Sequence, residues 1–356
     1  MLQRVESFTH RLGIRLPILL APMAGACPPP LSVAVAQAGG LGACGALLMK
    51  PHQIVTWADE FRSASSGGFQ MNLWIPDPAP KRDSEVETRV REFLASWGPA
   101  VPAEAGDVKL PNFEDQCRAL LSVSPKAISS IMGLYPPEFV REIKARGILW
   151  FATATTVPEA RAAEQAGADV IVAQGAEAGG HRGAFNPDAA DRESVGLFAL
   201  LPQITDAVSI PVVATGGIGD SRGIAAALTL GASAVQIGTG FLRTPEAKVH
   251  PVYADRLGRT EAHDTMITRA FSGRPGRSVA TGYVRAAVSG PPPAPYPVQR
   301  ALTAGMRQAA QKANDPERMQ MWAGQAAKYA RAEPAGVIVP QLWEDALSLL
   351  SSPSVR

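Results

Sequence analysis

A histidine within a glycine-rich segment is the residue of this sequence best suited to proton chemistry. His181 directly follows Gly179 and Gly180 in the stretch AQGAEAGGHRG. Imidazole exchanges a proton near neutral pH, and glycine lets a loop lie close against a ligand. We therefore interpret His181 as a catalytic base that also contacts the substrate. Gln174, in the same stretch, can offer both a donor and an acceptor to a planar polar ring.

Two further glycine-rich stretches, ATGGIGDSRG and QIGTG, each follow an apolar run. Gly216 and Gly217 lie in the first stretch, and Gly238 and Thr239 lie in the second. Glycine allows backbone N–H groups to approach a phosphate, and the amino end of a following helix favours the negative charge. Each stretch alone is also typical of an ordinary tight turn, but the two together predict a phosphate site.

Other apolar runs end in groups that suit a flat ligand. Asn72 lies in FQMNLWIP, where its amide is expected to point into the mouth of a barrel. Ala21, Pro22 and Met23 in LLAPMAGA form a small, stiff apolar ledge whose backbone is placed to contact a flat ring. Packing in the core is the alternative role for Met23.

Eight short apolar runs separated by helical segments must position these residues. They span 17–23, 41–45, 69–75, 127–133, 148–153, 170–175, 211–217 and 234–239. The runs are continuous rather than alternating, which is typical of parallel strands covered on both faces. Eight such units predict an α/β fold of the (β/α)8 TIM barrel type, with a doubly wound open sheet as the alternative. In a barrel, the candidate residues meet at the carboxyl ends of the strands.

The 356-residue chain is long enough for one barrel of about 250 residues with further segments. We assign residues 1–240 to the barrel, with an insertion at about 76–125 after the third strand. Residues 241–356 are predicted to form a C-terminal helical cover and tail that complete the substrate site. Packing on the outside of the barrel is the alternative for this helical segment. It is also a candidate contact for a homodimer, although no pattern demands one.

Composition excludes several other classes of function. The net charge of +2 and the lack of an arginine-rich helix or zinc-finger spacing argue against a nucleic-acid partner. The three cysteines form no CxxC pair or metal-ligand cluster and suit a reducing compartment. No apolar run approaches the roughly 20 residues that span a bilayer, and the N-terminus lacks a signal-peptide core. We expect a cytoplasmic protein without a metal or a membrane partner.

A phosphate site, amide side chains against a flat ring and one loop histidine fit a flavin mononucleotide (FMN) enzyme. The motifs that carry these features also resemble those of the nitronate monooxygenases, formerly called 2-nitropropane dioxygenases. The matching stretches are PILLAPMAG, MNLW, AQGAEAGGHRG, PVVATGGIGDSRG, VQIGTGFL, PYPVQRALT and MWAGQAA. They cover residues 17–244 and resume at 295–303 and 321–327, which is most of the chain.

This resemblance implies a site and a reaction. The family binds FMN without a covalent bond, and His181 matches its catalytic base. The matching FMN contacts are Asn72, Gln174, Gly179, Gly217, Gln236, Ile237, Gly238 and Thr239. Its substrates are alkyl nitronates such as propionate 3-nitronate, and sometimes neutral nitroalkanes, which oxygen converts to carbonyl compounds and nitrite or nitrate. For a neutral nitroalkane, His181 is expected first to remove the proton next to the nitro group.

Some features depart from the family pattern and leave alternatives open. Trp74 replaces a smaller or different apolar residue, and residues 82–111 match poorly, so both are expected to reshape the substrate pocket. Tyr296 either lines that pocket or pins the proline-rich segment around it. One alternative function is an NADH-dependent FMN reductase acting on a quinone or an enoyl thioester. Another is a flavin-binding protein without enzymatic activity.

Overall fold

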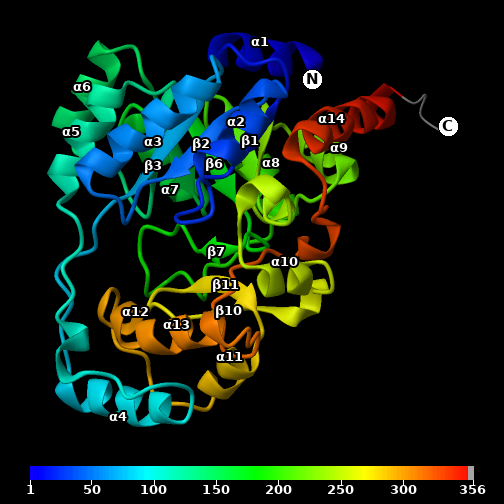
Figure 1. Ribbon diagram of the computed structural model, residues 1–356. Coiled ribbons are helices and arrows are strands. Elements are labelled where there is room, and N and C mark those ends of the chain that lie inside the picture. Colours follow the sequence, from blue (N-terminus) through cyan, green and yellow to red (C-terminus); the bar gives the residue numbers. More distant parts are fainter. Residues whose placement is uncertain (352–356) are drawn as a thin grey trace.

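Eight parallel strands within the described residues, 1–351, form a nearly closed barrel in this computed structural model (Figure 1). Their order is β1-β9-β8-β6-β5-β4-β3-β2. Hydrogen bonds from Leu20 N to Leu41 O, 2.9 Å, and from Leu41 N to Ile18 O, 3.1 Å, join the two ends of this sheet. The predicted TIM barrel is therefore confirmed, and the open-sheet alternative is wrong.

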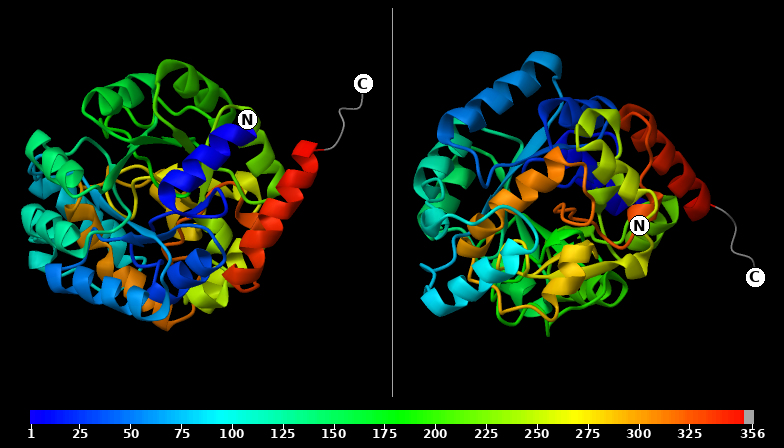
Figure 2. Two further views of the ribbon diagram at one scale, coloured as in Figure 1. Left: turned by 90° about the horizontal axis from the view of Figure 1, so that it is seen from above. Right: turned by 60° about the horizontal axis from the view of Figure 1, so that its bottom comes forward.

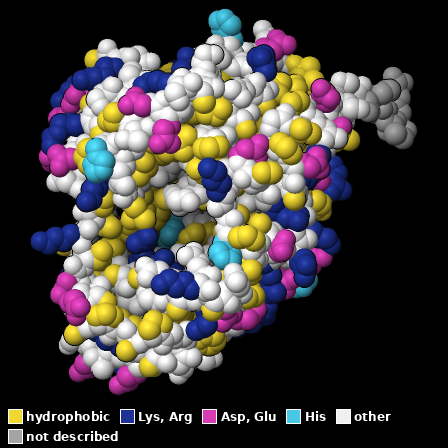
Figure 3. Space-filling view, in the orientation of Figure 1, with side chains coloured by type: hydrophobic (Ala, Val, Ile, Leu, Met, Phe, Trp, Pro, Cys, Tyr) yellow, Lys and Arg dark blue, Asp and Glu magenta, His cyan; other side chains and the backbone are white. Residues whose placement is uncertain are grey.

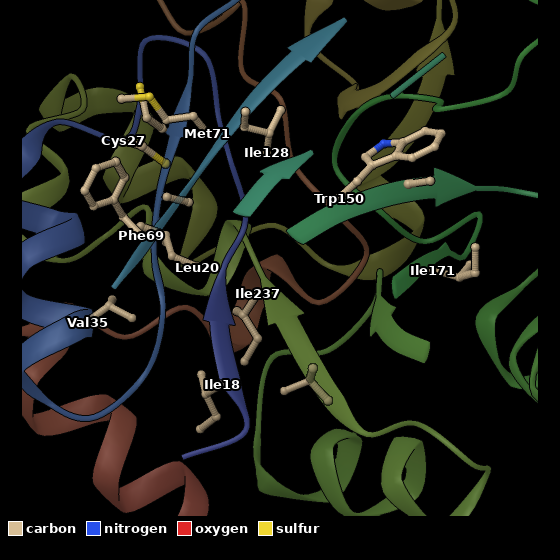
Figure 4. Packing of buried hydrophobic residues seen from close by; sticks show 14 of the residues in the cluster. Ile18, Leu20, Cys27, Val35, Phe69, Met71, Ile128, Trp150, Ile171 and Ile237 are labelled. Carbon is tan, nitrogen blue, oxygen red and sulfur yellow. The ribbon is translucent and has the colours of Figure 1, made fainter. Parts of the chain in front are cut away.

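Each predicted apolar run contains one barrel strand. The strands are β1 (Ile18–Leu20), β2 (Gly42–Gly45), β3 (Phe69–Trp74), β4 (Ala127–Ile131), β5 (Leu149–Ala154), β6 (Val170–Gln174), β8 (Val212–Thr215) and β9 (Ala234–Ile237). Their side chains pack against the surrounding helices in one continuous apolar layer. Figure 4 shows part of this layer, in which Ile18, Leu20 and Ile237 lie on neighbouring strands.

Helices alternate with the strands and form a ring around the barrel (Figure 2). They are α2 (Pro29–Gln37), α3 (Pro51–Ala64), α5 (Phe113–Val123), α6 (Pro137–Ala145), α7 (Val157–Gln165), α8 (Leu197–Ala207), α9 (Ser221–Thr229) and α14 (Ala335–Ser351). The helix α14 packs against α2 and α9. The last helix of the chain thus lies on the outside of the barrel, which was the alternative to a cover.

The inside of the barrel changes from apolar to polar along its axis. Helix α1 (Leu2–Leu12) crosses one end of the barrel (Figure 2), where Phe8 and Leu12 pack with Leu19 and Phe151 in a second apolar cluster. The polar side chains buried among the strands include Thr153 and Thr215 near the carboxyl ends and the amides of Gln70, Asn72, Gln174 and Gln236. The polar end is therefore the one that can receive a ligand.

A smaller group of elements, which we call the cap, lies at the polar end of the barrel (Figure 1). It contains a three-stranded antiparallel sheet in the order β10-β11-β7. Its members are β7 (Gly180–His181), β10 (Thr265–Thr268), β11 (Gly276–Val279), α4 (Ser84–Ala95), α10 (Pro251–Leu257), α11 (Gly282–Ala287), α12 (Val298–Leu302) and α13 (Ala304–Lys312). Short 3-10 turns lie at Ala103–Gly106, Thr239–Phe241, Pro245–Ala247, Ala262–Asp264 and Ala327–Tyr329.

The segment after β3 contributes to both parts of the molecule. Val90 and Leu94 of α4 are buried with Phe271 and Tyr283, so α4 belongs to the cap. The following helix, α5, packs against α3 in the ring around the barrel. Part of the range predicted as an insertion is thus a regular barrel helix.

Among the residues described, no helix is long and apolar enough to cross a membrane.

Candidate active site

Several amide side chains are buried among the barrel strands. Asn72 Nδ2, within β3, donates to Ser129 O at 3.2 Å and to Ser129 Oγ at 3.1 Å. Gln236 Oε1 accepts from Gln70 Nε2 at 2.9 Å. Each of these amides keeps at least one further donor or acceptor, because a primary amide has two of each. The cluster is fixed in place and can still bind a polar ring.

The ledge after β1 meets the turn after β9. Ala21 N donates to Ile237 O at 2.9 Å, which extends the strand pairing to the start of the ledge. A Cβ atom on Gly238 would lie 3.2 Å from Met23 Sδ and 3.3 Å from Ala21 Cβ. Pro22 lies between these two residues and is half-buried like them. Met23 also packs against the apolar core, which is the alternative role considered for it.

The turn after β8 has the backbone shape expected of a phosphate cradle. Gly216 and Gly217 have φ values of 111° and 68°, a region that favours glycine. A Cβ on Gly217 would lie 3.0 Å from Glu177 Cβ. Helix α9 begins just beyond, where the Asp220 side chain accepts from Gly223 N at 3.2 Å. Glycine turns followed by a helix amino end form a typical anion site.

A loop from the C-terminal part of the chain lies over these turns. Gly324 N donates to Thr239 Oγ1 at 3.0 Å. A Cβ on Gly179 would lie only 2.4 Å from Gly324 N, so this approach requires glycine. Gln325 N donates to Glu177 O at 2.9 Å. The histidine loop, the turn after β9 and residues 324–325 therefore meet at one place.

His181 lies in β7, which pairs with β11 of the cap. Its ring is held between Trp74 and Trp322, with 4.7 Å between ring centroids in each case. His181 Nε2 lies 2.7 Å from Ser272 Oγ. Gln174 supports the same loop: its Nε2 donates to His181 O at 3.2 Å, and its Oε1 accepts from Gly183 N at 2.8 Å.

The surroundings of His181 keep its ring neutral. Burial, followed by the positive charges of Arg274 and Arg300, lowers the pKa of His181 to about 3. Arg274 is itself buried, and its Nη1 binds both carboxylate oxygens of Asp77 at 2.6 and 2.7 Å. A neutral imidazole has a lone pair that can accept a proton, and the positive charges nearby would favour an anionic ligand.

Tyr296 lies on the same side of the site. Its ring centroid is 5.4 Å from that of Trp74, which in turn contacts His181. Among the residues that the structure describes, its buried hydroxyl has no hydrogen-bond partner. Burial raises the pKa of Tyr296 to about 12, so the hydroxyl keeps its proton and can donate it to a ligand. The structure thus brings Tyr296 together with His181.

Sequence reasoning missed several neighbours of His181. Ser272, Arg274 and Trp322 come from cap segments that lie far from His181 along the chain. Of these three residues, only Trp322 lies in a stretch that the sequence analysis singled out, MWAGQAA, which carries part of the resemblance to the nitronate monooxygenases. Arg182, the residue after His181, is buried and donates to Gly175 O at 2.6 Å. It holds the backbone at the end of β6.

The residues present fit a flavin. The positive-φ glycine turn and the amino end of α9 suit a phosphate, while the ledge at Ala21–Met23 suits a flat ring. The mouth amides can bind the polar edge of that ring. Among residues 1–351, no group of His, Cys, Asp and Glu side chains could hold a metal ion.

Comparison with known proteins gives a consistent picture. A family model described as nitronate monooxygenase matches residues 6–345. The probable nitronate monooxygenase of Staphylococcus aureus strain Newman is 35% identical over 338 residues, which are 94% of this chain and 95% of that protein.

Solved structures are similar over nearly the whole chain. The nitroalkane oxidase of Streptomyces ansochromogenes has a TM-score of 0.87 at 35% identity and covers 97% of this chain and 100% of its own. FabK from Thermotoga maritima has a TM-score of 0.75 at 29% identity, with coverage of 97% and 96%.

Proposed function

The chain belongs to the nitronate monooxygenase family of flavin-dependent oxidoreductases, and we propose that it binds FMN and oxidises alkyl nitronates with oxygen. The observation that carries this proposal is a neutral His181, fixed between two tryptophans and beside Ser272 at the mouth of the barrel. Propionate 3-nitronate and simple alkyl nitronates are the substrates to test first. The expected products are a carbonyl compound and nitrite or nitrate.

Specific residues are proposed to hold each part of FMN. Its phosphate would bind Gly216, Gly217 and the turn Gly238–Thr239, and its ring would lie on Ala21, Pro22 and Met23. The remaining proposed contacts are Asn72, Gln174, Gly179, Gly180, Gln236 and Ile237. Bound FMN supplies the capacity to take electrons from the substrate and pass them to oxygen.

The protein's own contribution is to prepare the substrate. One tautomer of His181, with the proton on Nε2, allows all the hydrogen bonds of the Ser272 hydroxyl to form together. In it, Nε2–H donates to Ser272 Oγ at 2.7 Å, while that oxygen also accepts from Arg274 N at 3.3 Å and donates to Arg274 O at 3.2 Å. The Nδ1 lone pair then has no hydrogen-bond partner within residues 1–351 and can accept a proton.

With a neutral nitroalkane, this free nitrogen takes the proton from the carbon next to the nitro group. The C–H bonding pair moves onto the nitro group and gives a nitronate. The charges of Arg274 and Arg300 stabilise that anion. A substrate that arrives as a nitronate needs no proton transfer, so His181 then acts only in binding.

The second candidate is an NADH-dependent FMN reductase acting on a quinone or an enoyl thioester. The similarity to FabK supports this alternative, because the same barrel and glycine turns serve both proteins. The chain is an enzyme by its family, which argues against a flavin-binding protein without activity.

A cytoplasmic location is proposed from the three unpaired cysteines. A homodimer is also proposed.

One experiment separates the two candidates. The purified protein with FMN is mixed, without oxygen, either with propionate 3-nitronate or with NADH, and the flavin absorbance is followed. Bleaching by the nitronate and no response to NADH supports the proposed function. Rapid bleaching by NADH with no response to the nitronate contradicts it and favours the reductase.

A further inference from the structure

We propose that the segment after β3 builds an apolar slot for the tail of the substrate, so that the enzyme selects nitro compounds with a linear hydrocarbon chain. The proposal rests on the proposed function of the His181 site and assigns a role to the poorly matched residues that follow Trp74. A cavity of about 320 Å³ lies there. Its lining includes Trp74, Asp77, Leu110, Gln116 and Tyr296, together with several prolines.

The slot presents a mainly apolar surface to a ligand, because the charged and amide side chains that line it already have hydrogen-bond partners within the protein. Asp77 is paired with Arg274 through both carboxylate oxygens. Gln116 Nε2 donates to the carbonyl oxygens of Ala46, Leu47 and Met49, the shortest at 2.8 Å. Tyr296 Oη is the buried lining atom without a partner among the described residues. A fitting ligand therefore has a hydrocarbon tail and one hydrogen-bond acceptor.

The slot shares Trp74, a neighbour of His181, as one of its walls. Trp74 and Tyr296 both line it, and the Trp74 ring lies 4.7 Å from the ring of His181 and 5.4 Å from that of Tyr296. A substrate atom that accepts a hydrogen bond from the Tyr296 hydroxyl therefore lies near His181, the proposed base. A nitro group has such an oxygen, and its carbon chain then extends away from His181 into the slot.

The walls of the slot are stiff, which favours a preformed site. Five of the lining residues are prolines, and proline fixes its own φ angle. A rigid apolar site binds a chain without first losing its own conformational freedom. Each methylene that enters such a site is expected to raise kcat/KM about fourfold until the slot is full.

The test uses the FMN-loaded enzyme and linear 1-nitroalkanes from nitroethane to 1-nitrooctane. The variant Leu110→Trp places a large ring at the slot, and Leu110 is 36% exposed, so folding tolerates the change. The control is Leu349→Trp on α14, outside the slot, where the residue is 49% exposed. We expect the rise in kcat/KM per methylene in the wild type and in Leu349→Trp, and less than about twofold per methylene in Leu110→Trp. Equal chain-length dependence in all three proteins, or none in the wild type, would overturn the proposal.

A binding measurement separates this proposal from the proposed function. Linear primary alcohols from propanol to octanol carry the same chain and an acceptor oxygen, and their affinity is measured by calorimetry without turnover. Affinity that rises with chain length in the wild type and not in Leu110→Trp supports the slot even if no nitronate is oxidised. Nitronate oxidation with no chain-length dependence in either assay overturns the slot and leaves the proposed function intact.

Discussion

His181 combines two properties that a proton-abstracting base needs, a fixed ring and a neutral charge. Trp74 and Trp322 both pack against the ring, and Ser272 lies within hydrogen-bond distance of Nε2. Burial and two arginines keep the imidazole unprotonated. The same arginines favour the anion that forms when a nitroalkane loses its proton. These features support the proposed role of His181 as the base that removes the proton of a neutral nitroalkane.

The substitution His181→Asn should therefore separate two substrates. We expect kcat/KM for neutral nitroethane to fall by about 10²-fold or more, which is the usual contribution of a general base. Activity on ethyl nitronate, which is already deprotonated, should stay within a few fold, and FMN should bind as in the wild type. Full nitroethane turnover in this variant would show that another group is the base.

The pH dependence of the wild type tests the charge of the same ring. A group whose pKa is lowered from 6.5 to about 3 is neutral at every pH well above 3, and it loses its function only as the pH falls toward that value. We therefore expect kcat/KM for nitroethane to be constant between about pH 5 and 7, where the free enzyme's base stays unprotonated. A decrease with an apparent pKa near 6.5 would contradict the desolvated histidine.

Ser272 is a positioning residue for His181, because its hydroxyl contacts only the ring nitrogen and the backbone of Arg274. The change Ser272→Ala removes the hydrogen bond that positions the His181 ring, together with two longer ones to the backbone of Arg274. We therefore expect kcat/KM for nitroethane to fall about fivefold to tenfold. Ethyl nitronate should be oxidised at the wild-type rate. The matched control is Ser233→Ala, since Ser233 is equally buried and its Oγ has no partner in the described structure. A parallel loss on both substrates would indicate a general structural defect.

Two turns between a strand and a helix are the elements proposed to hold the FMN phosphate. In Gly217→Val, a side chain is forced into a backbone with φ 68° and against Glu177, and in Gly238→Val it meets Met23 and Ala21. Either change should weaken FMN binding at least about tenfold. Gly147→Val is the control, because Gly147 has φ 67° but open space around it. Flavin content and the Kd of FMN measure the effect; normal values in both site variants would refute the phosphate assignment.

Sequence patterns predict elements best where a local rule operates. Continuous apolar runs located every strand of the barrel, and glycine spacing located the turns at Gly217 and Gly238. The cap was harder, because β7 is two residues long and gains its partner β11 only through tertiary folding. The position of α14 could not be predicted from its sequence either, because an amphipathic helix can pack over the mouth of a barrel or on its outside. Contacts such as His181–Ser272 have no local signal at all.

The molecule as a whole closes one end of its barrel and leaves the other available. Helix α1 seals the apolar end, while α4 and the other cap elements stand at the polar end. Figure 3 shows the surface hollowed between the barrel half and the cap half, with lysine and arginine side chains around the hollow. An anionic substrate is attracted by such a rim.

Because the two ends of the barrel have separate roles, a substitution in the core beneath α1 should lower the stability of the protein without changing the proposed FMN site. Phe8 is 2% exposed and packs with Leu12 inside the barrel, so Phe8→Ala should lower the free energy of unfolding by about 3–5 kcal/mol. The control is Phe198→Ala, where the ring is 75% exposed and a change within about 0.5 kcal/mol is expected. Urea unfolding with excess FMN, followed by circular dichroism, measures both. The Kd of FMN should match the wild type in each, because the phosphate turns lie at the opposite end of the strands. If Phe8→Ala is as mild as Phe198→Ala, α1 does not seal the barrel.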